Sequence, residues 1–320
     1  MVPRLYISRP LPEPVLTAAR AVCAVTVSPD NDPMDAAQAG LALTTYDAIL
    51  PSLGDAFNAD AIAATTDLKC RLLANFGVGY NHIDVNAARK RGITVTNTPG
   101  VLTDATADLA ITLMLMTARR AGEGERMVRA GKWPGWHPTQ MLGMHVTGKT
   151  IGIIGMGRIG QAVARRAHFG FGMDVVFFNR SKIQDCGIPG ARQLDTMAEV
   201  MAQSDVISVN TPGGAENRHL ISAKVLAAAR PQSIIVNTAR GDVIDEAALI
   251  NALKSGTLAG AGLDVFEHEP HVPDDLKAME NVVLLPHLGT NALEVRTAMG
   301  LIAVDNVRAF FEGREVPNPV

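Results

Sequence analysis

The 320-residue sequence is poor in cysteine and has no excess of positive charge, and each shortage excludes a class of function. Its three cysteines are far apart in the sequence and match neither a disulfide framework nor a metal-binding spacing: Cys23, Cys70 and Cys186. This usage is typical of free thiols in a reducing compartment. Lys and Arg number 29 against 32 Asp and Glu, so no basic excess is available to bind phosphate backbones. We therefore expect neither a metal site nor a nucleic-acid partner.

The sequence also lacks a hydrophobic run long enough to cross a bilayer. Its most apolar stretch, residues 109–120, is shorter than the roughly 20 residues that a spanning helix needs, and Asp108 and Arg119 flank it. The first residues reach Pro10 and Pro12 before any apolar run forms, which is unlike a signal peptide. We therefore expect a soluble, cytoplasmic protein with no membrane partner.

Short apolar runs alternate with helical patterns along the whole chain. The runs are rich in Val and Ile and nearly continuous in apolar character, as is typical of strands buried on both faces. The helical segments between them indicate βαβ units and a parallel sheet. At about 150 residues per domain, the length predicts two domains. The predicted strands are residues 4–8, 47–51, 71–75, 93–97, 150–155, 174–179, 205–210, 233–238, 260–265 and 282–286.

Two longer helices and one irregular segment interrupt this alternation. The pattern predicts a helix from Thr103 to about residue 121 and a last helix from about Asn291 to Glu312. Residues 122–148 contain Gly, Pro and both tryptophans but no clear period. A long irregular segment inside a compact protein is usually functional, so we expect an interaction arm there, with an ordered surface loop as the alternative.

Residues 150–167, TIGIIGMGRIGQAVARRA, contain a G-x-G-x-x-G pattern. The pattern follows an apolar run and opens an amphipathic helix, which is the context of a dinucleotide-binding loop. Gly155 permits the tight turn, Gly157 lets the backbone approach a pyrophosphate, and Gly160 lets the helix pack on the strand. The helix N-terminus supplies free N–H groups for phosphates. The alternative is a plain glycine turn.

The next predicted strand ends at Asn179, where an NAD enzyme usually has an acidic residue that binds the ribose 2′-hydroxyl. Asn179 is uncharged and would not repel a 2′-phosphate. Arg180 offers a planar donor fork, Ser181 a hydroxyl and Lys182 a further positive charge. These residues predict that NADP(H) is preferred and NAD(H) possible. A solvated basic turn without a ligand is the alternative.

Three later strands each lead into a polar residue of distinct chemistry: Arg240, then Asp264 with Glu269, then His287. Ligands of an open α/β sheet bind outside the carboxyl ends of its strands. There His287 would protonate a carbonyl oxygen while Glu269 fixes the imidazole tautomer. Arg240 would bind a substrate carboxylate and polarise the carbonyl.

The other histidines lack such neighbours, and we expect them to be solvated or structural. His268 is the one rival to His287, because it adjoins Glu269, although its surroundings EHEP are more typical of an exposed turn. The remaining ones are His82, His137, His145, His168, His219 and His271.

Together these motifs make the sequence resemble the D-isomer-specific 2-hydroxyacid dehydrogenase family over its whole length. The segment NFGVGYNHID (75–84) is similar to the family's substrate-carboxylate loop. Four further segments resemble its other signatures: GMGRIG (155–160), NTARG (237–241), DVFEHEP (264–270) and PHLGT (286–290). Within the family, GWHPTQMLG (135–143) and the Asn-Arg-Ser strand tip resemble the glyoxylate and hydroxypyruvate reductase branch.

The resemblance implies an activity and the residues that perform it. The activity is NAD(P)H-dependent reduction of a small 2-oxo acid, glyoxylate or hydroxypyruvate, to glycolate or D-glycerate. Arg240, Glu269 and His287 become the catalytic triad, and the N–H groups of Val78 and Gly79 bind the substrate carboxylate. The implied cofactor site consists of Gly155, Met156, Gly157, Arg158, Ile159, Gly160, Asn179, Arg180, Ser181, Thr211, Pro212, Thr238, Ala239, Asp264 and Gly289.

The resemblance also implies an α/β fold of two Rossmann-like, doubly wound parallel-sheet domains with a cleft between them. Residues 1–98 plus 289–320 would form a discontinuous substrate-binding domain. Residues 99–288 would form the dinucleotide-binding domain, with the dimer arm of a homodimer at about 122–148.

Other functions stay open on the sequence alone. A phosphoglycerate dehydrogenase would share the triad. The fold also serves in a dinucleotide-sensing corepressor, which would prefer NAD and usually carries long flanking tails that this sequence lacks. The small residues around Leu53 in PSLGD (51–55) favour a short substrate.

Overall fold

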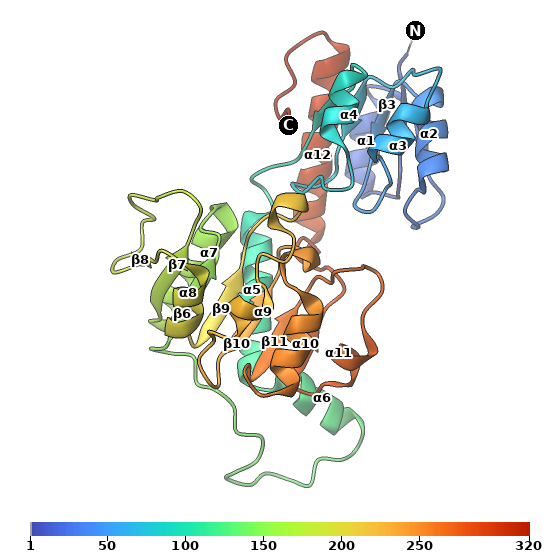
Figure 1. Cartoon of the computed structure of the whole chain (residues 1–320). Coiled ribbons are helices and arrows are strands. Elements are labelled where there is room, and N and C mark those ends of the chain that lie inside the picture. The colour runs from blue at the N-terminus through green and yellow to red at the C-terminus, as the bar shows by residue number, and fades with distance from the viewer. Residues whose placement is uncertain (1) are drawn as a thin grey trace. The chain divides into compact units, whose positions relative to one another are not determined.

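The computed structural model describes residues 2–320 as two compact α/β units (Figure 1). The first unit ends at Leu102 and also includes Asn291–Val320, and the second unit is Thr103–Thr290. Each unit has its own sheet and its own hydrophobic core. No helix within residues 2–320 combines the length and the apolar character needed to cross a bilayer.

A five-stranded parallel sheet forms the centre of the first unit. Its strands are β1 (Arg4–Ile7), β2 (Ala24–Val27), β3 (Ala48–Leu50), β4 (Leu72–Ala74) and β5 (Thr94–Thr96). They lie in the order β2-β1-β3-β4-β5, which is flavodoxin-like. Every residue of β3 and β4 is buried, as expected of parallel strands that are covered on both faces.

Helices cover both faces of this sheet. They are α1 (Glu13–Arg20), α2 (Ala36–Thr45), α3 (Ala59–Ala64), α4 (Val85–Lys90) and α12 (Leu293–Phe311). The helices α1 and α12 pack on one face around Leu5 and Ile7, and α2 to α4 pack on the other around Ile49 and Leu73. The C-terminal helix α12, red in Figure 1, therefore completes the core of the N-terminal unit.

A seven-stranded parallel sheet forms the centre of the second unit. Its strands are β6 (Thr150–Ile154), β7 (Asp174–Phe178), β8 (Arg192–Gln193), β9 (Val206–Val209), β10 (Ile234–Asn237), β11 (Gly260–Leu263) and β12 (Val282–Leu284). Their order is β12-β11-β10-β9-β6-β7-β8. The winding reverses between β6 and β9, which is the switch point where a Rossmann sheet binds its ligand.

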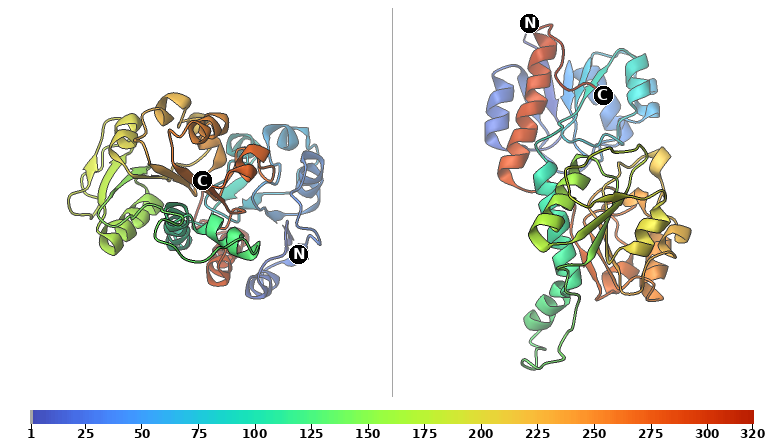
Figure 2. Two further views of the ribbon diagram at one scale, coloured as in Figure 1. Left: turned by 90° about the horizontal axis from the view of Figure 1, so that it is seen from below. Right: turned by 90° about the vertical axis from the view of Figure 1, so that its left-hand side faces the viewer.

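Helices also cover both faces of the second sheet. They are α5 (Thr103–Ala118), α6 (Ala121–Arg129), α7 (Arg158–Phe171), α8 (Met197–Gln203), α9 (Ala223–Leu226), α10 (Glu246–Lys254) and α11 (Asp274–Ala278). Two short 3-10 turns are η1 (Ala215–Asn217) and η2 (Gly241–Val243). The helices α5 and α7 lie side by side on one face, as the right-hand view of Figure 2 shows, and α8 to α10 pack on the other.

All ten predicted strands are present, with ends within two residues of those predicted. The two strands that were not predicted, β2 and β8, lie at sheet edges. The strand β2 alternates exposed and half-buried residues, and β8 has two residues, so neither gives the continuous apolar run of a central strand.

The predictions around residues 119–148 are partly wrong. The long helix ends at Ala118 rather than at 121, and Arg120 adopts a left-handed backbone with φ 51°. A second helix, α6, then occupies the start of the segment predicted to be irregular. It buries no residue and contains Gly122 and Gly124, which are weak helix formers, and ion pairs such as Arg129 with Glu125 support it.

Candidate active site

The glycine loop lies at the carboxyl end of β6, at the switch point of the second sheet. Gly155 has φ 91°, and a Cβ atom there would lie 2.9 Å from the carbonyl carbon and oxygen of Asn210. A Cβ atom on Gly160 would overlap the carbonyl oxygen of Gly155. Only glycine therefore fits either position. The helix α7 starts after Gly157 without a side-chain cap, so its first N–H groups remain available to an anion.

Asn179, just after β7, is fastened to the glycine loop. Its Oδ1 accepts a hydrogen bond from the N–H of Met156 at 3.2 Å, and its Nδ2 donates to both the carbonyl and the hydroxyl of Ser181 at 3.0 Å. The Arg180 side chain is 90% exposed, and its guanidinium lies 3.7 Å from the equally exposed Glu216 carboxylate. Such a long surface ion pair contributes little, so Arg180 can turn to another anion.

Buried polar atoms without partners gather where β9 and β10 end. Within residues 2–320, no hydrogen-bond partner is found for Asn210 Oδ1, Thr211 Oγ1 or Thr238 Oγ1. Buried polar groups are usually paired, and a site that leaves several unpaired is typically completed by a ligand. Together with the glycine loop, these atoms fit a nicotinamide dinucleotide.

Asp264 holds the turn that carries His287. Asp264 is fully buried, its two carboxylate oxygens accept the N–H groups of Leu288 at 2.6 Å and Gly289 at 2.9 Å, and its carbonyl accepts the N–H of His287. Burial raises the pKa of Asp264 above its usual value, although these N–H groups and His287 oppose the shift. His287 has φ 53°, an unusual conformation for a residue other than glycine, and these contacts fix it.

Glu269 and His287 form a direct pair. His287 Nδ1 lies 2.9 Å from Glu269 Oε2, and both side chains are about 29% exposed. The other oxygen of Glu269 accepts the N–H of Phe266 at 3.1 Å. Burial raises the pKa of Glu269, but the hydrogen bond and charge of His287 outweigh it, so the net pKa is below the usual value. Glu269 is thus an ionised partner for an imidazole whose Nε2 has no hydrogen-bond partner within residues 2–320 and can contact a ligand.

Arg240 follows β10, on the same carboxyl side of the sheet as Glu269. Its Nη1 donates to the carbonyl of Ala239 at 2.6 Å, and its buried Nε has no partner within residues 2–320. Burial lowers the pKa of Arg240, while the nearby carboxylates of Glu269 and Asp242 raise it. A guanidinium keeps its proton in proteins, so a charged donor with spare bonding capacity stands near the pair.

The loop after β4 in the first unit presents two backbone N–H groups. Asn75 Nδ2 donates to the carbonyls of Gly77 at 3.0 Å and Gly79 at 3.1 Å, and Asn97 Nδ2 donates to the carbonyl of Val78 at 3.1 Å. Three successive carbonyls are therefore bound to the protein. The N–H groups of Val78 and Gly79 have no acceptor within residues 2–320, and a pair of free N–H groups can bind an anion.

Comparison with known proteins identifies the family of the chain. The D-isomer specific 2-hydroxyacid dehydrogenase family, NAD binding domain, matches residues 111–289, more than half of the chain. The chain belongs to this dehydrogenase family. A glyoxylate reductase of Korarchaeum cryptofilum is 42% identical over 322 residues, covering 100% of this chain and 96% of that protein. A glyoxylate reductase of Thermococcus litoralis is 41% identical over 325 residues, covering 100% and 97%.

A solved structure is similar over the same length. It is an NADPH-dependent glyoxylate/hydroxypyruvate reductase from Sinorhizobium meliloti in complex with NADP and malonate. It is 36% identical, the match covers 100% of this chain and 97% of that one, and the TM-score is 0.88. The dehydrogenase therefore has a nicotinamide dinucleotide as its cofactor, in keeping with the family and with the polar atoms of its second unit.

Sequence reasoning missed one histidine of the dehydrogenase. His219 was expected to have no such neighbours, but its Nε2 lies 2.9 Å from Oε1 of Glu267, whose side chain is 8% exposed. The two residues are 48 positions apart, so no local pattern could show the contact. The rival His268 is 69% exposed and lies 3.9 Å from Glu267, whereas Glu269 pairs with His287.

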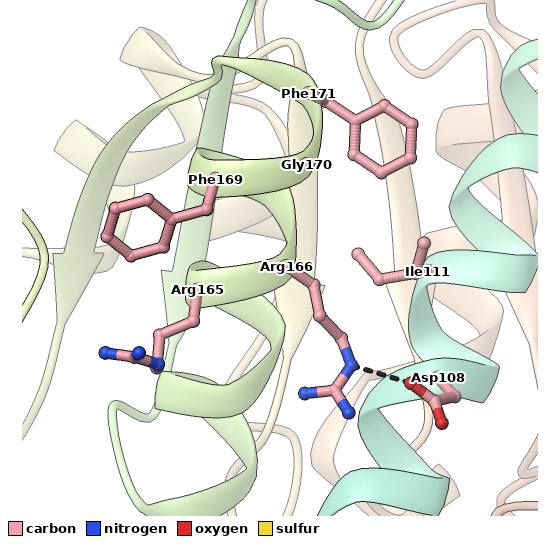
Figure 3. A pocket seen from close by; sticks show the side chains of 7 residues that line it. All are labelled: Asp108, Ile111, Arg165, Arg166, Phe169, Gly170 and Phe171. Atoms are coloured by element: carbon pink, nitrogen blue, oxygen red, sulfur yellow. Dashed lines mark hydrogen bonds and ion pairs between the residues drawn. The ribbon is translucent and has the colours of Figure 1, made fainter.

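A pocket of about 580 Å³ lies on α5 and α7, away from these residues (Figure 3). Arg166 donates to Asp108 at 2.6 Å and also pairs with Asp104, so its charge is balanced. The pocket is lined by Asp108, Ile111, Arg165, Arg166, Phe169, Gly170 and Phe171. None of the predicted site residues lines it. Within residues 2–320, no group of three or more His, Cys, Asp or Glu is placed to hold a metal ion.

Proposed function

We propose that this dehydrogenase reduces glyoxylate or hydroxypyruvate to the 2-hydroxy acid with NAD(P)H. The observation that supports this most is the direct pair of His287 with an ionised Glu269 at the carboxyl edge of the nucleotide-binding sheet. Reducing a carbonyl to an alcohol needs a hydride at carbon and a proton at oxygen. The relatives named glyoxylate reductase support a small 2-oxo acid as substrate.

The residues of the chain then divide the chemistry among them. A bound nicotinamide dinucleotide supplies the hydride. His287 donates the proton from Nε2 to the carbonyl oxygen, and Glu269 at Nδ1 stabilises the imidazolium before transfer. Arg240 polarises the carbonyl and binds the substrate carboxylate with its guanidinium. In the first unit, the N–H groups of Val78 and Gly79 are the proposed donors to a substrate carboxylate.

Three groups of residues would hold the cofactor. The N–H groups at the start of α7 would bind the pyrophosphate. Asn179, Arg180 and Ser181 would bind the adenosine ribose, and the exposed Arg180 would favour NADPH by pairing with its 2′-phosphate. The remaining candidates are Thr211, Pro212, Thr238, Ala239, Asp264 and Gly289, which would line the nicotinamide side.

Initial rates test this function. The purified protein should be assayed with glyoxylate, hydroxypyruvate, pyruvate and phenylpyruvate, each with NADPH and with NADH. We expect kcat/KM to be highest for one of the first two acids. Higher values for phenylpyruvate, or no oxidation of either cofactor, would contradict the proposal.

We further propose that α6 and the segment after it are a dimer arm. Trp136 is 79% exposed, and Trp133, Leu142 and Val128 are also exposed. Figure 2 shows this segment extending from the body of the second unit. Exposed apolar groups gathered on one extension are typical of an interface. Light scattering during gel filtration should give the mass of a dimer for the wild type. The double variant Trp133→Ser with Trp136→Ser should shift the mass toward that of the monomer. A monomeric wild type would contradict the dimer arm.

A further inference from the structure

Glu267 lies two residues before Glu269 and forms a polar cluster that the reduction chemistry does not use. Its side chain is 8% exposed, and its Oε1 lies 2.5 Å from Arg218 Nη2 and 2.9 Å from His219 Nε2. Its backbone N–H donates to Glu246 Oε2 at 3.3 Å. A nearly buried carboxylate with two cationic or donor partners is fixed in position, and removing one partner is costly.

The cluster joins two loops at the carboxyl edge of the second sheet. Arg218 and His219 belong to the loop after β9, which starts with the cofactor-lining candidates Thr211 and Pro212. Glu267 belongs to the loop after β11, which carries the predicted orienting carboxylate. The contacts at Glu267 therefore tie the two loops together.

The loop after β10 is packed against both of them. A Cβ atom on Gly241 would overlap the carbonyl of Phe266, so this close approach requires glycine. On the other side, the carbonyl of Asp242 accepts the N–H of His219 at 2.8 Å, and its Oδ2 accepts the N–H of Gly214 at 3.0 Å. All three loops thus form one connected unit.

The connection reaches Glu269 through the backbone donor next to Glu267. Phe266, the residue before Glu267, donates its N–H to Oε1 of Glu269, whose Oε2 binds His287. If the Glu267 side chain were released, the backbone that orients the Glu269 carboxylate would lose one of its anchors.

We propose that Glu267, held by His219 and Arg218, is a positioning residue that keeps the Glu269 carboxylate aligned with His287. The proposal rests on the reductase function, because Glu269 acts only through that reaction. Burial raises the pKa of Glu267, but His219 and Arg218 lower it by more, so its net pKa is below the usual value. The carboxylate is therefore ionised. No hydrogen bond or ion pair joins Glu267 to His287 within residues 2–320, so its effect is indirect.

Paired variants test this role with glyoxylate and NADPH. Glu267→Ala and His219→Ala should lower kcat by about 10- to 100-fold, the usual effect of a small misplacement of a catalytic group, with KM for the oxo acid within about threefold of wild type. His219→Gln keeps an amide donor for Glu267 and should retain kcat within about threefold. The matched control is Asp275→Asn, which removes an exposed carboxylate that lies 2.7 Å from Lys254, and it should leave kcat unchanged.

Hydrogen–deuterium exchange provides a readout that does not depend on turnover. Exchange in residues 264–271 and 211–221 should be faster in Glu267→Ala than in wild type and unchanged in Asp275→Asn. Wild-type kcat together with wild-type exchange in Glu267→Ala would overturn the positioning role, as would equal loss of kcat in His219→Gln and His219→Ala. If the wild type reduces no oxo acid, the proposed function fails, while the exchange still tests the anchor. If Glu267→Ala does not fold, the two His219 variants decide the question.

Discussion

His287 Nδ1 lies 2.9 Å from Glu269 Oε2, and this contact determines which nitrogen of His287 can act. Because Nδ1 faces the carboxylate, Nε2 is the atom left to transfer a proton. Asp264 fixes the same residue from its backbone, since its carbonyl accepts the N–H of His287 at 2.9 Å. The backbone and the ring of His287 are therefore each held by a separate contact.

Replacing His287 should remove the proton donor without removing the cofactor site. We expect His287→Gln to lower kcat by about 10²–10⁴-fold, the usual contribution of general acid catalysis. The dissociation constant of NADPH, measured by fluorescence titration, should stay within about threefold. His268→Gln is the matched control, because His268 is exposed and Glu269 pairs with His287 instead. A variant that turns over within threefold of wild type would refute the assignment.

The lowered pKa of Glu269 predicts a pH dependence of stability. A carboxyl whose pKa is lower in the folded than in the unfolded state stabilises the fold above the unfolded value and loses this effect as pH falls through the folded value. The usual value is 4.5, so the extra stability of wild type over Glu269→Gln should be full above it and should shrink as pH falls below it. It should be lost only below the lower pKa of the folded state. Urea unfolding of both proteins from pH 3.5 to 7 measures this, and a constant difference over that range would contradict the lowered pKa.

The loop after β4 offers a test that is independent of the triad. Asn75→Ala removes the donor to two carbonyls, so the N–H groups of Val78 and Gly79 should lose their fixed direction. We expect KM for the oxo acid to rise about tenfold, equivalent to one hydrogen bond of about 1.4 kcal/mol, with little change in kcat. Asn306→Ala is a matched control, because Asn306 is an equally buried amide that contacts Ile302 and Asn318 instead. Equal KM values in Asn75→Ala and wild type would refute the carboxylate assignment.

Sequence reasoning located the sheet and its loops because the signal is local. Each of Arg240, Glu269 and His287 follows a run of apolar residues that parallel strands require, so the edge of the sheet could be read directly. The glycine loop could also be predicted from the sequence. Close packing leaves no space for a Cβ atom at Gly155 or Gly160, so these positions require glycine and give a sequence pattern.

The contacts that hold these groups could not be predicted in the same way. Asn75 holds the loop by donating hydrogen bonds to backbone carbonyls. The spacing of apolar residues in a sequence does not predict a hydrogen bond from a side chain to the backbone. His219 and Glu267 come from loops after different strands, and only the folded sheet brings them to 2.9 Å. The helix α6 is short, buries no residue and contains two glycines, so helix propensity argued against it in the sequence.

Arg180 and Asn179 are expected to determine the cofactor preference. Arg180 is 90% exposed, so solvent weakens its pairing with a 2′-phosphate, and we expect Arg180→Ala to lower kcat/KM for NADPH by about tenfold and to leave NADH nearly unchanged. Asn179→Asp should add a repulsion to the 2′-phosphate and should also release Ser181, because a carboxylate cannot donate the two hydrogen bonds that Nδ2 makes. The double variant, Asn179→Asp with Arg180→Ala, should therefore prefer NADH. The change should be mainly in KM for the cofactor, because these groups bind the ground state and the transition state alike.

Glu216→Gln is the matched control for that experiment, since it removes the carboxylate nearest Arg180 without touching Asn179. It should leave kcat/KM for NADPH equal to wild type or raise it slightly, because Arg180 then has no competing anion. The measurement is kcat/KM for both cofactors at one saturating concentration of oxo acid. If wild type uses NADH as well as NADPH, or if Arg180→Ala lowers both values equally, then Arg180 is a solvated surface residue and does not select the cofactor.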